Sequence, residues 1–476
     1  MSIQIFLQGK IPGIEEFLRD AAGDFEGRAQ WAALLSEMIP RALLSELGLA
    51  QLLLGSAGGG QFLVVLPEEF RGRASDICDK VSLALQQRTG GAIRLVWAIT
   101  EDLGTWADIR KRLALDLADW SATPAMALGL AYFSDALAAS GTAPFATTYR
   151  RGAVVGWSSD RPAEILSGPD AESAKARWTL GEEVPWADHA APDDDGSAAA
   201  SLDTLASRAT GHWAWGVLRG DVDGFEARLR RSDNVVEHLQ VSQMYRQFIV
   251  NELQAVCSLP EFWQNTKVLY ASGQSFAVVG AWDSLIGLAR EMQRIFAMFV
   301  SSALREYAGI EGKTISMAVS LASEEQARLE SVYADAGDKL QAAKTAGRDS
   351  IWVLGRPLEW KQLADAADSK TTMSRLIREC GASRQFLDEL AAFYRDSVEA
   401  TITPGTTRST NTRVEKPWRF YRRLNSVLPV VGRGRDYQKL RADLISDFTG
   451  RRASNIRLRP QGRVALEWAR LETGVV

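Results

Sequence analysis

The segment Val268–Val279, VLYASGQSFAVV, constrains the fold of this chain more than any other stretch. It is predicted to form two apolar strands joined by a turn of small residues around Gly273. Glycine in such a turn lets the backbone approach a phosphate closely, so a nucleotide site is one hypothesis for the hairpin. The turn carries Gln274 and Ser275, however, at positions where a metal-dependent nucleotidyl transferase needs carboxylates.

A second hairpin with a glycine turn lies in the first quarter of the chain. The runs LAQLLL and QFLVVLP flank the turn formed by Gly58, Gly59 and Gly60. Consecutive glycines are typical of a tight hairpin that needs positive φ angles, and their N–H groups could also cradle phosphates. The pattern leaves both functions open, so these three glycines are candidate nucleotide-binding residues.

The same order of elements surrounds both hairpins. Around the first, the sequence predicts a strand, a helix, the hairpin, a helix and a strand, at Ile3–Leu7, Phe25–Leu47, 49–67, Asp76–Gln87 and Ala92–Ile99. Around the second, it predicts a strand at 213–225, a helix at Val241–Val256 and the hairpin at Lys267–Gly280. Helices at Ser284–Tyr307 and Ala327–Lys344 then alternate with strands at Thr314–Leu321 and Ser350–Leu354. The order β-α-β-β-α-β is that of a ferredoxin-like module, so we expect two such modules.

The fold class that follows is α+β. The two ferredoxin-like domains are expected at residues 1–120 and 206–357, with a linker region at 121–205 between them. A helical, basic C-terminal domain is expected at 358–476. The linker region is the least regular part of the sequence. It is expected to contain a helix at Met126–Ala139 and a pair of strands at Tyr149–Arg151 and Val154–Trp157. The acidic stretch APDDDGSAAAS at 191–201 is expected to be a solvated loop.

Composition excludes several classes of protein. Three widely spaced cysteines, Cys78, Cys257 and Cys380, indicate a reducing compartment and exclude a disulfide framework and a four-cysteine zinc site. There is no His-Asp pair and no HExxH among the three histidines, which argues against a histidine-based metallohydrolase. No run is long and apolar enough to span a membrane, so the chain is expected to be soluble and cytoplasmic, without a membrane partner.

Asp221 and Asp223 are the strongest candidates for chemistry. They lie two residues apart at the end of a predicted strand, so both carboxylates should share one face. Paired aspartates of this kind can hold the divalent cations of nucleotidyl transfer, although such pairs are also common in plain turns. Because Gln274 and Ser275 add no carboxylate, we expect no catalysis, no cofactor and no confident metal site. Lys339 and Lys344, in the last predicted helix, could meet a phosphate but are expected on a solvated face.

The C-terminal region is strongly basic. From Thr401 to Val476 there are 16 Lys and Arg against 6 Asp and Glu, a net charge of +10 in a chain whose total is −4. Guanidinium and aromatic groups together, as in KPWRFYRR, suit a nucleic-acid backbone and unstacked bases, and they also suit an acidic protein partner. The candidate RNA-binding residues are Lys416, Arg419, Arg422, Arg423, Arg433, Arg435, Arg451 and Arg452.

In its order and spacing of motifs, the chain resembles the palm-domain large subunit of type III CRISPR effector complexes. The stretches IFLQGKIPGIEEFL, FEGRAQWAALLSEMIPRALLSELGL and GSAGGGQFLVVLP look like that family's first palm, which we assign to residues 1–120. The stretches GVLRGDVDGF, VLYASGQSFAVVGAWDSLIGLAREMQRIF, KTISMAVSLA and AGDKLQAAKTAGRDSIWVLGR look like its second palm, assigned to 206–357. The C-terminal part, ending in RLRPQGRVALEWARL, is similar to its helical domain.

The resemblance implies a divergent member of that family. The family's cyclase hairpin reads GGDD, whereas the matching positions here are Ser272, Gly273, Gln274 and Ser275. The family's histidine-aspartate nuclease domain and its four-cysteine zinc site are not found in the sequence. We therefore expect a non-catalytic scaffold subunit that binds the guide RNA (crRNA) 5′ handle and the guide–target duplex beside handle-binding, backbone and small subunits. Two alternatives stay open: a nucleotide-binding sensor, and a residual cyclase that uses Asp221 and Asp223.

Overall fold

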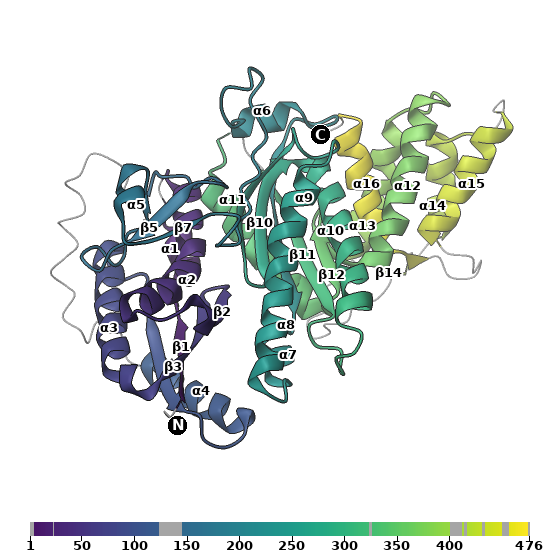
Figure 1. The fold of residues 1–476 in the computed structure, drawn as a ribbon. Coiled ribbons are helices and arrows are strands. Elements are labelled where there is room, and N and C mark those ends of the chain that lie inside the picture. The colour runs from purple at the N-terminus through teal and green to yellow at the C-terminus, as the bar shows by residue number, and fades with distance from the viewer. Residues whose placement is uncertain are drawn as a thin grey trace.

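The computed structural model describes residues 4–21, 23–122, 145–322, 326–399, 412–413, 417–430, 434–449 and 457–474. The first palm and the C-terminal helices lie on opposite sides of the second palm (Figure 1). The α+β fold class is confirmed. The helix expected at Met126–Ala139 lies outside the described residues. Among the described helices, none combines the length and the apolar character that crossing a bilayer requires.

The first palm is a four-stranded antiparallel sheet with the ferredoxin-like strand order. Its elements are β1 (Gln4–Lys10), α1 (Ile14–Arg19), α2 (Phe25–Leu47), β2 (Leu54–Gly58), β3 (Gln61–Pro67), α3 (Arg71–Arg88), β4 (Val96–Glu101) and α4 (Trp106–Ala122). The strands lie in the order β2-β3-β1-β4. The expected strand start at Leu49 is wrong, because Gln51–Leu53 form a 3-10 turn that turns Leu52 into solvent.

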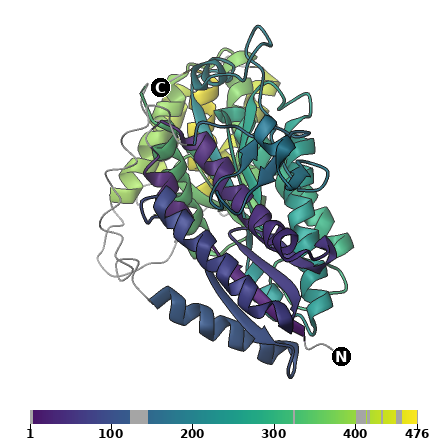
Figure 2. The same ribbon diagram turned by 60° about the vertical axis from the view of Figure 1, so that its left-hand side comes forward.

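Helix α2 holds the two palms together. It has the predicted bounds and ends at Gly48, whose φ of 70° makes it the expected left-handed cap. The sequence predicts one apolar face, but nearly every residue from Ala29 to Leu44 is buried. The reason is that α2 packs on β2 and β3 of its own sheet and also on β9 (Thr266–Ser272) of the second palm. Figure 2 brings the first palm forward, with α2 and α3 side by side across it.

The second palm repeats the ferredoxin-like order within a larger, six-stranded sheet. Its elements are β8 (Trp215–Asp223), α7 (Phe225–Arg230), α8 (Val235–Gln247), α9 (Leu253–Cys257), β9, β10 (Ser275–Ala281), α10 (Trp282–Ala303), β11 (Thr314–Leu321), α11 (Leu329–Ala346), β12 (Ser350–Val353) and β13 (Arg356–Glu359). The order is β13-β12-β11-β8-β10-β9, so the four strands of the module keep the arrangement of the first palm. Two elements were not predicted from the sequence, namely β13 and the π-helical stretch Phe248–Glu252 that joins α8 to α9.

The two faces of the second sheet have different neighbours. On one face, Leu218, Val222 and Val278 share a core with the helices α8 to α10. On the other face, Val217 and Val279 belong to the core of the first palm, to which α11 also contributes. Because side chains alternate along a strand, the odd-numbered residues of β8 all face the first palm and α11.

The linker region forms a small three-stranded sheet whose buried side chains join the core of the first palm. It contains β5 (Val154–Trp157), β6 (Leu166–Ser167), α5 (Pro169–Ser173), β7 (Ala176–Thr179) and α6 (Leu202–Ser207). The expected pairing of Tyr149–Arg151 with β5 is wrong: β5 pairs with β6 and β7, and the Tyr149 N–H donates to Gln30 Oε1 of α2 at 2.8 Å. The acidic loop is solvated only at its tip, because the N–H of Ala191 at its base donates to the Thr266 carbonyl of β9 at 2.9 Å.

The C-terminal region is helical, as expected, and shares the core of the second palm. Its elements are α12 (Trp360–Arg378), α13 (Gln385–Glu399), β14 (Thr412–Arg413), α14 (Pro417–Val427), α15 (Arg435–Thr449), β15 (Arg457–Leu458) and α16 (Pro460–Glu472). Leu363 of α12, Phe386 of α13 and Trp468 of α16 belong to the cluster that contains Leu218 and Val278. The helical domain is therefore built onto the palm sheet and does not hang from a linker.

Candidate functional site

The glycine turns of the two palms meet tip to tip. The Gly59 N–H of the first palm donates a hydrogen bond of 2.8 Å to Ser272 Oγ of the second. A Cβ atom on Gly273 would lie 2.7 Å from the nitrogen and 2.8 Å from the Cα of Gly59, closer than real Cβ contacts come. Gly273 also has a φ of +60°. Both the space and the backbone conformation therefore require glycine at this point.

The triple-glycine turn has the conformation expected of a tight hairpin. Gly58, Gly59 and Gly60 all have positive φ, at 111°, 65° and 75°. A Cβ on Gly58 would lie 2.9 Å from the Gly273 nitrogen. Since the Gly59 N–H is engaged by Ser272, one of the donors expected to cradle a phosphate is already used. Phosphate binding at these three glycines stays a prediction.

Asp223 is a buried carboxylate with its hydrogen-bonding capacity largely filled. Its oxygens accept hydrogen bonds from Thr314 Oγ1 at 2.9 Å, from Ser316 Oγ at 2.8 Å and from the Asp349 N–H at 3.0 Å. The residue is 3% exposed. Thr314 and Ser316 come from the neighbouring strand β11 and Asp349 from the turn between α11 and β12. This arrangement stabilises the charge without a metal ion.

Asp221 is held by an ion pair with Lys344, from the last turn of α11. The two side chains are 21% and 20% exposed, so the expectation that Lys344 lies on a solvated face is wrong. Burial raises the pKa of the Asp221 carboxyl, and the Lys344 ammonium opposes this shift. Asp221 and Asp223 do share one face, as predicted, but each is satisfied by different partners.

The turn beside these aspartates contributes amide and hydroxyl groups. Ser275 lies opposite Asp221 in the pairing of β10 with β8, and the Val222 N–H donates to the Gln274 carbonyl at 3.1 Å. The Gln274 Oε1 atom is buried and has no hydrogen-bond partner among the described residues. Ser272 Oγ faces Gly59. The four turn positions therefore bring no negative charge to the two aspartates.

A divalent cation, which cyclase-type palms use, does not fit these side chains. Mg²⁺ prefers several oxygen ligands in near-octahedral geometry, usually including free carboxylate oxygens. Here Asp223 accepts three hydrogen bonds and Asp221 is paired with Lys344. Within the described ranges, no three His, Cys, Asp or Glu side chains gather as a metal site.

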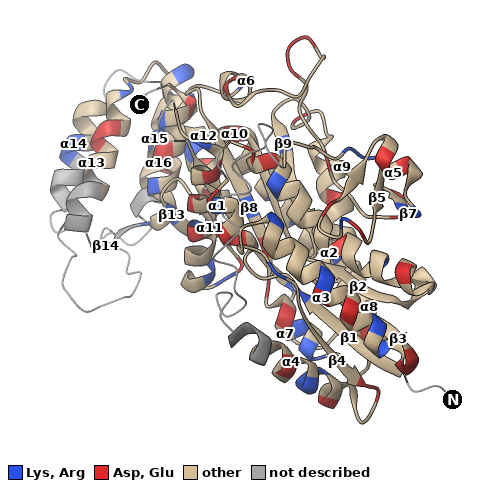
Figure 3. Ribbon diagram, turned by 90° about the vertical axis from the view of Figure 1, so that its left-hand side faces the viewer, with Lys and Arg blue, Asp and Glu red and all other residues tan. Residues whose placement is uncertain are grey.

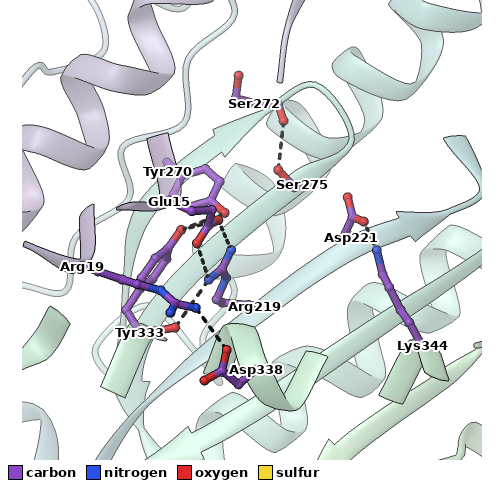
Figure 4. A network of polar contacts seen from close by, with 10 residues as sticks. All are labelled: Glu15, Arg19, Arg219, Asp221, Tyr270, Ser272, Ser275, Tyr333, Asp338 and Lys344. Atoms are coloured by element: carbon purple, nitrogen blue, oxygen red, sulfur yellow. Dashed lines mark hydrogen bonds and ion pairs between the residues drawn. The ribbon is translucent and has the colours of Figure 1, made fainter. Parts of the chain in front are cut away.

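A polar cluster between the palms was not anticipated from the sequence (Figure 4). Arg219 of β8 reaches Glu15 of α1 through two hydrogen bonds of 3.2 and 2.5 Å, and its guanidinium carbon lies 4.0 Å from the centre of the Tyr333 ring. The Tyr333 hydroxyl is 3.4 Å from Glu15 and from the Tyr270 hydroxyl. The spacing of two residues between Arg219, Asp221 and Asp223 could have indicated that Arg219 shares the face of the two aspartates.

A second ionic cluster crosses the palms beneath the glycine turns. Glu37 of α2, 4% exposed, pairs with Arg41 at 2.7 Å and with Arg246 of α8 at 2.9 Å. Its Oε1 atom lies 3.2 Å from the position that a Cβ of Gly58 would take. Buried charges are tolerated when they are paired, and removing one partner is costly. The contact between the turns is thus supported by ionic groups as well as by backbone.

Two cavities flank the contact between the turns. One, of about 560 Å³, lies between the first-palm sheet, α4 and α7, and its lining includes Gly58, Gly273, Trp106 and Arg230. The other, of about 470 Å³, is lined by Gly59, Gly60, Glu15, Ser272 and Ser275, among others. Each is of the size that small-molecule sites have. The backbone contact between the turns lies between the two cavities.

The basic C-terminal candidates are only partly described. Arg422 and Arg423 of α14 and Arg435 of α15 are exposed. The backbone of Arg419 lies in α14. Lys416, Arg433, Arg451 and Arg452 lie outside the described residues. Figure 3 shows basic residues on these helices, and Figure 1 places α14 and α15 on the far side of the molecule from the first palm.

The chain is similar to known proteins in its second palm and in its overall fold. Residues 214–352 match the family described as Cas10/Cmr2, second palm domain. Over 197 residues, the chain is 26% identical to the CRISPR system single-strand-specific deoxyribonuclease Cas10/Csm1 (subtype III-A) of Thermococcus onnurineus (strain NA1). That match covers 37% of this chain and 24% of the relative, about a quarter of its length.

The fold as a whole is similar to solved structures of Csm1–Csm4 assemblies. The Csm1–Csm4 cassette in complex with cA4 gives a TM-score of 0.71 at 17% identity, over 100% of this chain and 70% of that chain. The Csm1–Csm4 subcomplex of the type III-A CRISPR-Csm interference complex gives 0.70 at 17% identity, over the same shares. At this level of identity the likeness establishes the fold.

The fold is that of a two-palm protein, and residues 214–352 match the second palm domain of the Cas10/Cmr2 family. Within that class, the resemblance to the palm-domain large subunit of type III CRISPR effector complexes, inferred from the sequence, is confirmed.

Proposed function

We propose that the chain is a non-catalytic scaffold subunit of a type III CRISPR effector complex, acting in antiviral defence. One observation carries the proposal: at the turn Ser272–Ser275, where a cyclase needs carboxylates, the second palm presents neutral side chains and a glycine in direct contact with Gly59. Phosphoryl transfer depends on cations that neutralise the developing charge. With Asp221 and Asp223 already satisfied, the second palm is suited to hold the first palm in place.

The partners in this proposal are the guide RNA, the target RNA and other effector subunits. The solved structures with a similar fold are assemblies of Csm1 with Csm4, which supports a second protein subunit as a neighbour. The exposed arginines Arg422, Arg423 and Arg435 support contact with a polyanion. The chain would contribute to binding the 5′ handle end of the guide and the guide–target duplex.

Co-purification tests the assembly part of the proposal. The tagged chain would be purified from cells that express the neighbouring genes, and the RNA it carries would be sequenced. We expect a guide RNA of constant 5′ sequence and at least one further subunit. Binding of RNA to the purified complex should weaken steeply between 50 and 200 mM salt, because phosphate contacts release counterions. Recovery of the chain without RNA or partners would contradict the proposal.

A second candidate function is a nucleotide sensor, which the two cavities beside the glycine contact favour. Each cavity is large enough for a nucleotide and is lined by residues of both palms, such as Gly58 with Gly273, and Gly60 with Ser272. In this function, ATP would bind without turnover. Residual cyclase activity through Asp221 and Asp223 is the remaining alternative, and the ion pair of Asp221 with Lys344 argues against it.

Thermal unfolding with ATP separates the sensor from the scaffold. A ligand that binds the folded state at a hundred times its Kd adds about 2.7 kcal/mol of stability. The sensor function predicts a rise in Tm at millimolar ATP with and without Mg²⁺, and AMP at the same concentration is the control. The scaffold function predicts no change in Tm with either nucleotide.

A further inference from the structure

The turn that follows α11 satisfies both aspartates of β8. Lys344, in the last turn of the helix, pairs with Asp221. Five residues later, the Asp349 N–H donates to Asp223 at 3.0 Å. Between them the chain adopts an unusual conformation, since Arg348 and Asp349 have φ angles of 62° and 45°. Non-glycine residues in the left-handed region are uncommon, and they persist only where surrounding contacts favour them.

The contacts around this turn show what holds it in place. Ser350 Oγ donates to the Ala343 carbonyl at 3.0 Å, which fixes the end of α11 against the start of β12. Strand β12 pairs in parallel with β11, the strand that supplies Thr314 and Ser316 to Asp223. Lys344 also lies near the negative end of the helix dipole, where a cation is favoured. The position of the ammonium is thus set by the fold.

We propose that Lys344 is a built-in counter-ion of Asp221 that takes the place of a divalent cation, so that the second palm keeps its charge balance without metal. Asp223 has no such counter-ion, and its carboxylate is stabilised by hydrogen bonds from Thr314, Ser316 and the Asp349 N–H. The pair is partly buried, so removing one partner leaves a poorly solvated charge and destabilises the fold. The second palm is therefore expected to fold and bind its partners equally well in a chelator and in Mg²⁺.

This inference rests on the proposed function in one respect, namely that no cation is needed for chemistry. It is tested on the purified full chain without nucleotide, so that its failure can be told from failure of the proposed function. Binding of Mn²⁺ is measured by electron paramagnetic resonance, and Tm is measured in EDTA, Mg²⁺ and Mn²⁺. For the wild-type chain we expect no Mn²⁺ binding that depends on Asp221, and the same Tm in all three conditions.

Variants sharpen the test. Lys344→Met should lower Tm by several degrees in EDTA, and Mn²⁺ should restore part of the loss because it can pair with the vacated carboxylate. The double variant Lys344→Met with Asp221→Asn should lose less, and Mn²⁺ should not restore it. The matched control is Lys339→Met on the same helix, where the lysine pairs at 2.5 Å with the half-exposed Asp335 and also donates to Ser320 Oγ at 3.1 Å. Because Asp335 stays solvated, this variant should lower Tm less than Lys344→Met, and Mn²⁺ should not restore the loss.

Two results would overturn the inference. One is Mn²⁺ binding by the wild-type chain that disappears in Asp221→Asn, which would show that the carboxylate is open to metal. The other is a Lys344→Met chain as stable as the wild type in EDTA. If Lys344→Met does not fold, the comparison of Mn²⁺ binding by wild type and Asp221→Asn decides alone. A nucleotide product would contradict the proposed function without bearing on this binding measurement.

Discussion

The two palms share a strand order but differ in what they present to each other. At the contact between the turns the first palm offers backbone, because its three glycines carry no side chain and the Gly59 N–H donates to Ser272. Away from the turns, its helices α1 and α2 offer the carboxylates of Glu15 and Glu37. The second palm offers polar side chains, since Ser272, Arg219 and Asp221 all point from its sheet to this side. The difference indicates that the two modules have complementary surfaces. The charged groups of the second palm already have partners in the protein, since Arg219 pairs with Glu15 and Asp221 with Lys344.

The largest expected effect comes from the contact between the turns. Gly273→Val puts a branched side chain onto Gly59 and into a left-handed backbone conformation, and should destabilise the chain by about 4 kcal/mol, measured by urea unfolding. The control is Gly355→Val, where φ is +84° and nothing lies within 4 Å of the added Cβ. That variant carries the backbone strain alone, so equal losses at the two positions would show that the contact between the palms adds nothing.

The next effect comes from Asp223. Asp223→Ala leaves the hydroxyls of Thr314 and Ser316 and the Asp349 N–H without their acceptor, and the loss in unfolding free energy should be about 3 kcal/mol. Asp195→Ala, at the exposed tip of the acidic loop, should stay within about 0.5 kcal/mol of wild type. A neutral Asp223→Ala variant would mean that these hydrogen bonds do not support the second palm.

A smaller effect is expected at the polar cluster between the palms. Glu15→Ala removes the bidentate partner of Arg219, which is 8% exposed, and should cost about 1 to 1.5 kcal/mol because Glu15 itself is half exposed. Asp338→Ala breaks the exposed pair of Arg19 with Asp338 at 3.1 Å and should change stability by less than about 0.5 kcal/mol. Equal losses of unfolding free energy in the two variants would show that Glu15 does not stabilise Arg219.

The smallest effect is a dependence on pH at His238, which lies in α8 and packs edge-on against Trp106 of the first palm at 5.2 Å. Burial lowers the pKa of His238 to about 4. The unfolded chain binds the proton more readily, so stability is constant above about pH 6.5 and falls as the pH drops toward 4, by about 1 kcal/mol after allowance for partial exposure. His238→Gln should flatten this part of the stability–pH curve, and an unchanged curve would reject the assignment.

Much of the fold could be predicted because it depends on local patterns. The bounds of α2 and β11 were predicted to the residue, since a long apolar helix with a glycine cap and a continuous apolar strand are both strong local signals. The burial of α2 on almost all sides could not be predicted in this way. Periodicity reports which residues favour an apolar neighbour, and it does not report that a second sheet covers the remaining face.

The candidate site was predictable in its parts but not in its contacts. The pairing of Asp221 with Asp223 on one face follows from strand geometry, and so does the lack of carboxylates at Gln274 and Ser275. The ion pair of Asp221 with Lys344 joins positions 123 residues apart. Only the packing of α11 against β8 brings these two side chains together. A single sequence does not show which helix packs on which strand, so the ion pair could not be predicted.

The proposed scaffold function requires that the second palm makes no nucleotide product. The most direct test incubates the purified complex with ATP, Mg²⁺ and matching target RNA and analyses the products by mass spectrometry. The account predicts unchanged ATP and no cyclic or linear oligoadenylate. A cyclic product that disappears when Asp221 and Asp223 are both changed to Ala would contradict it.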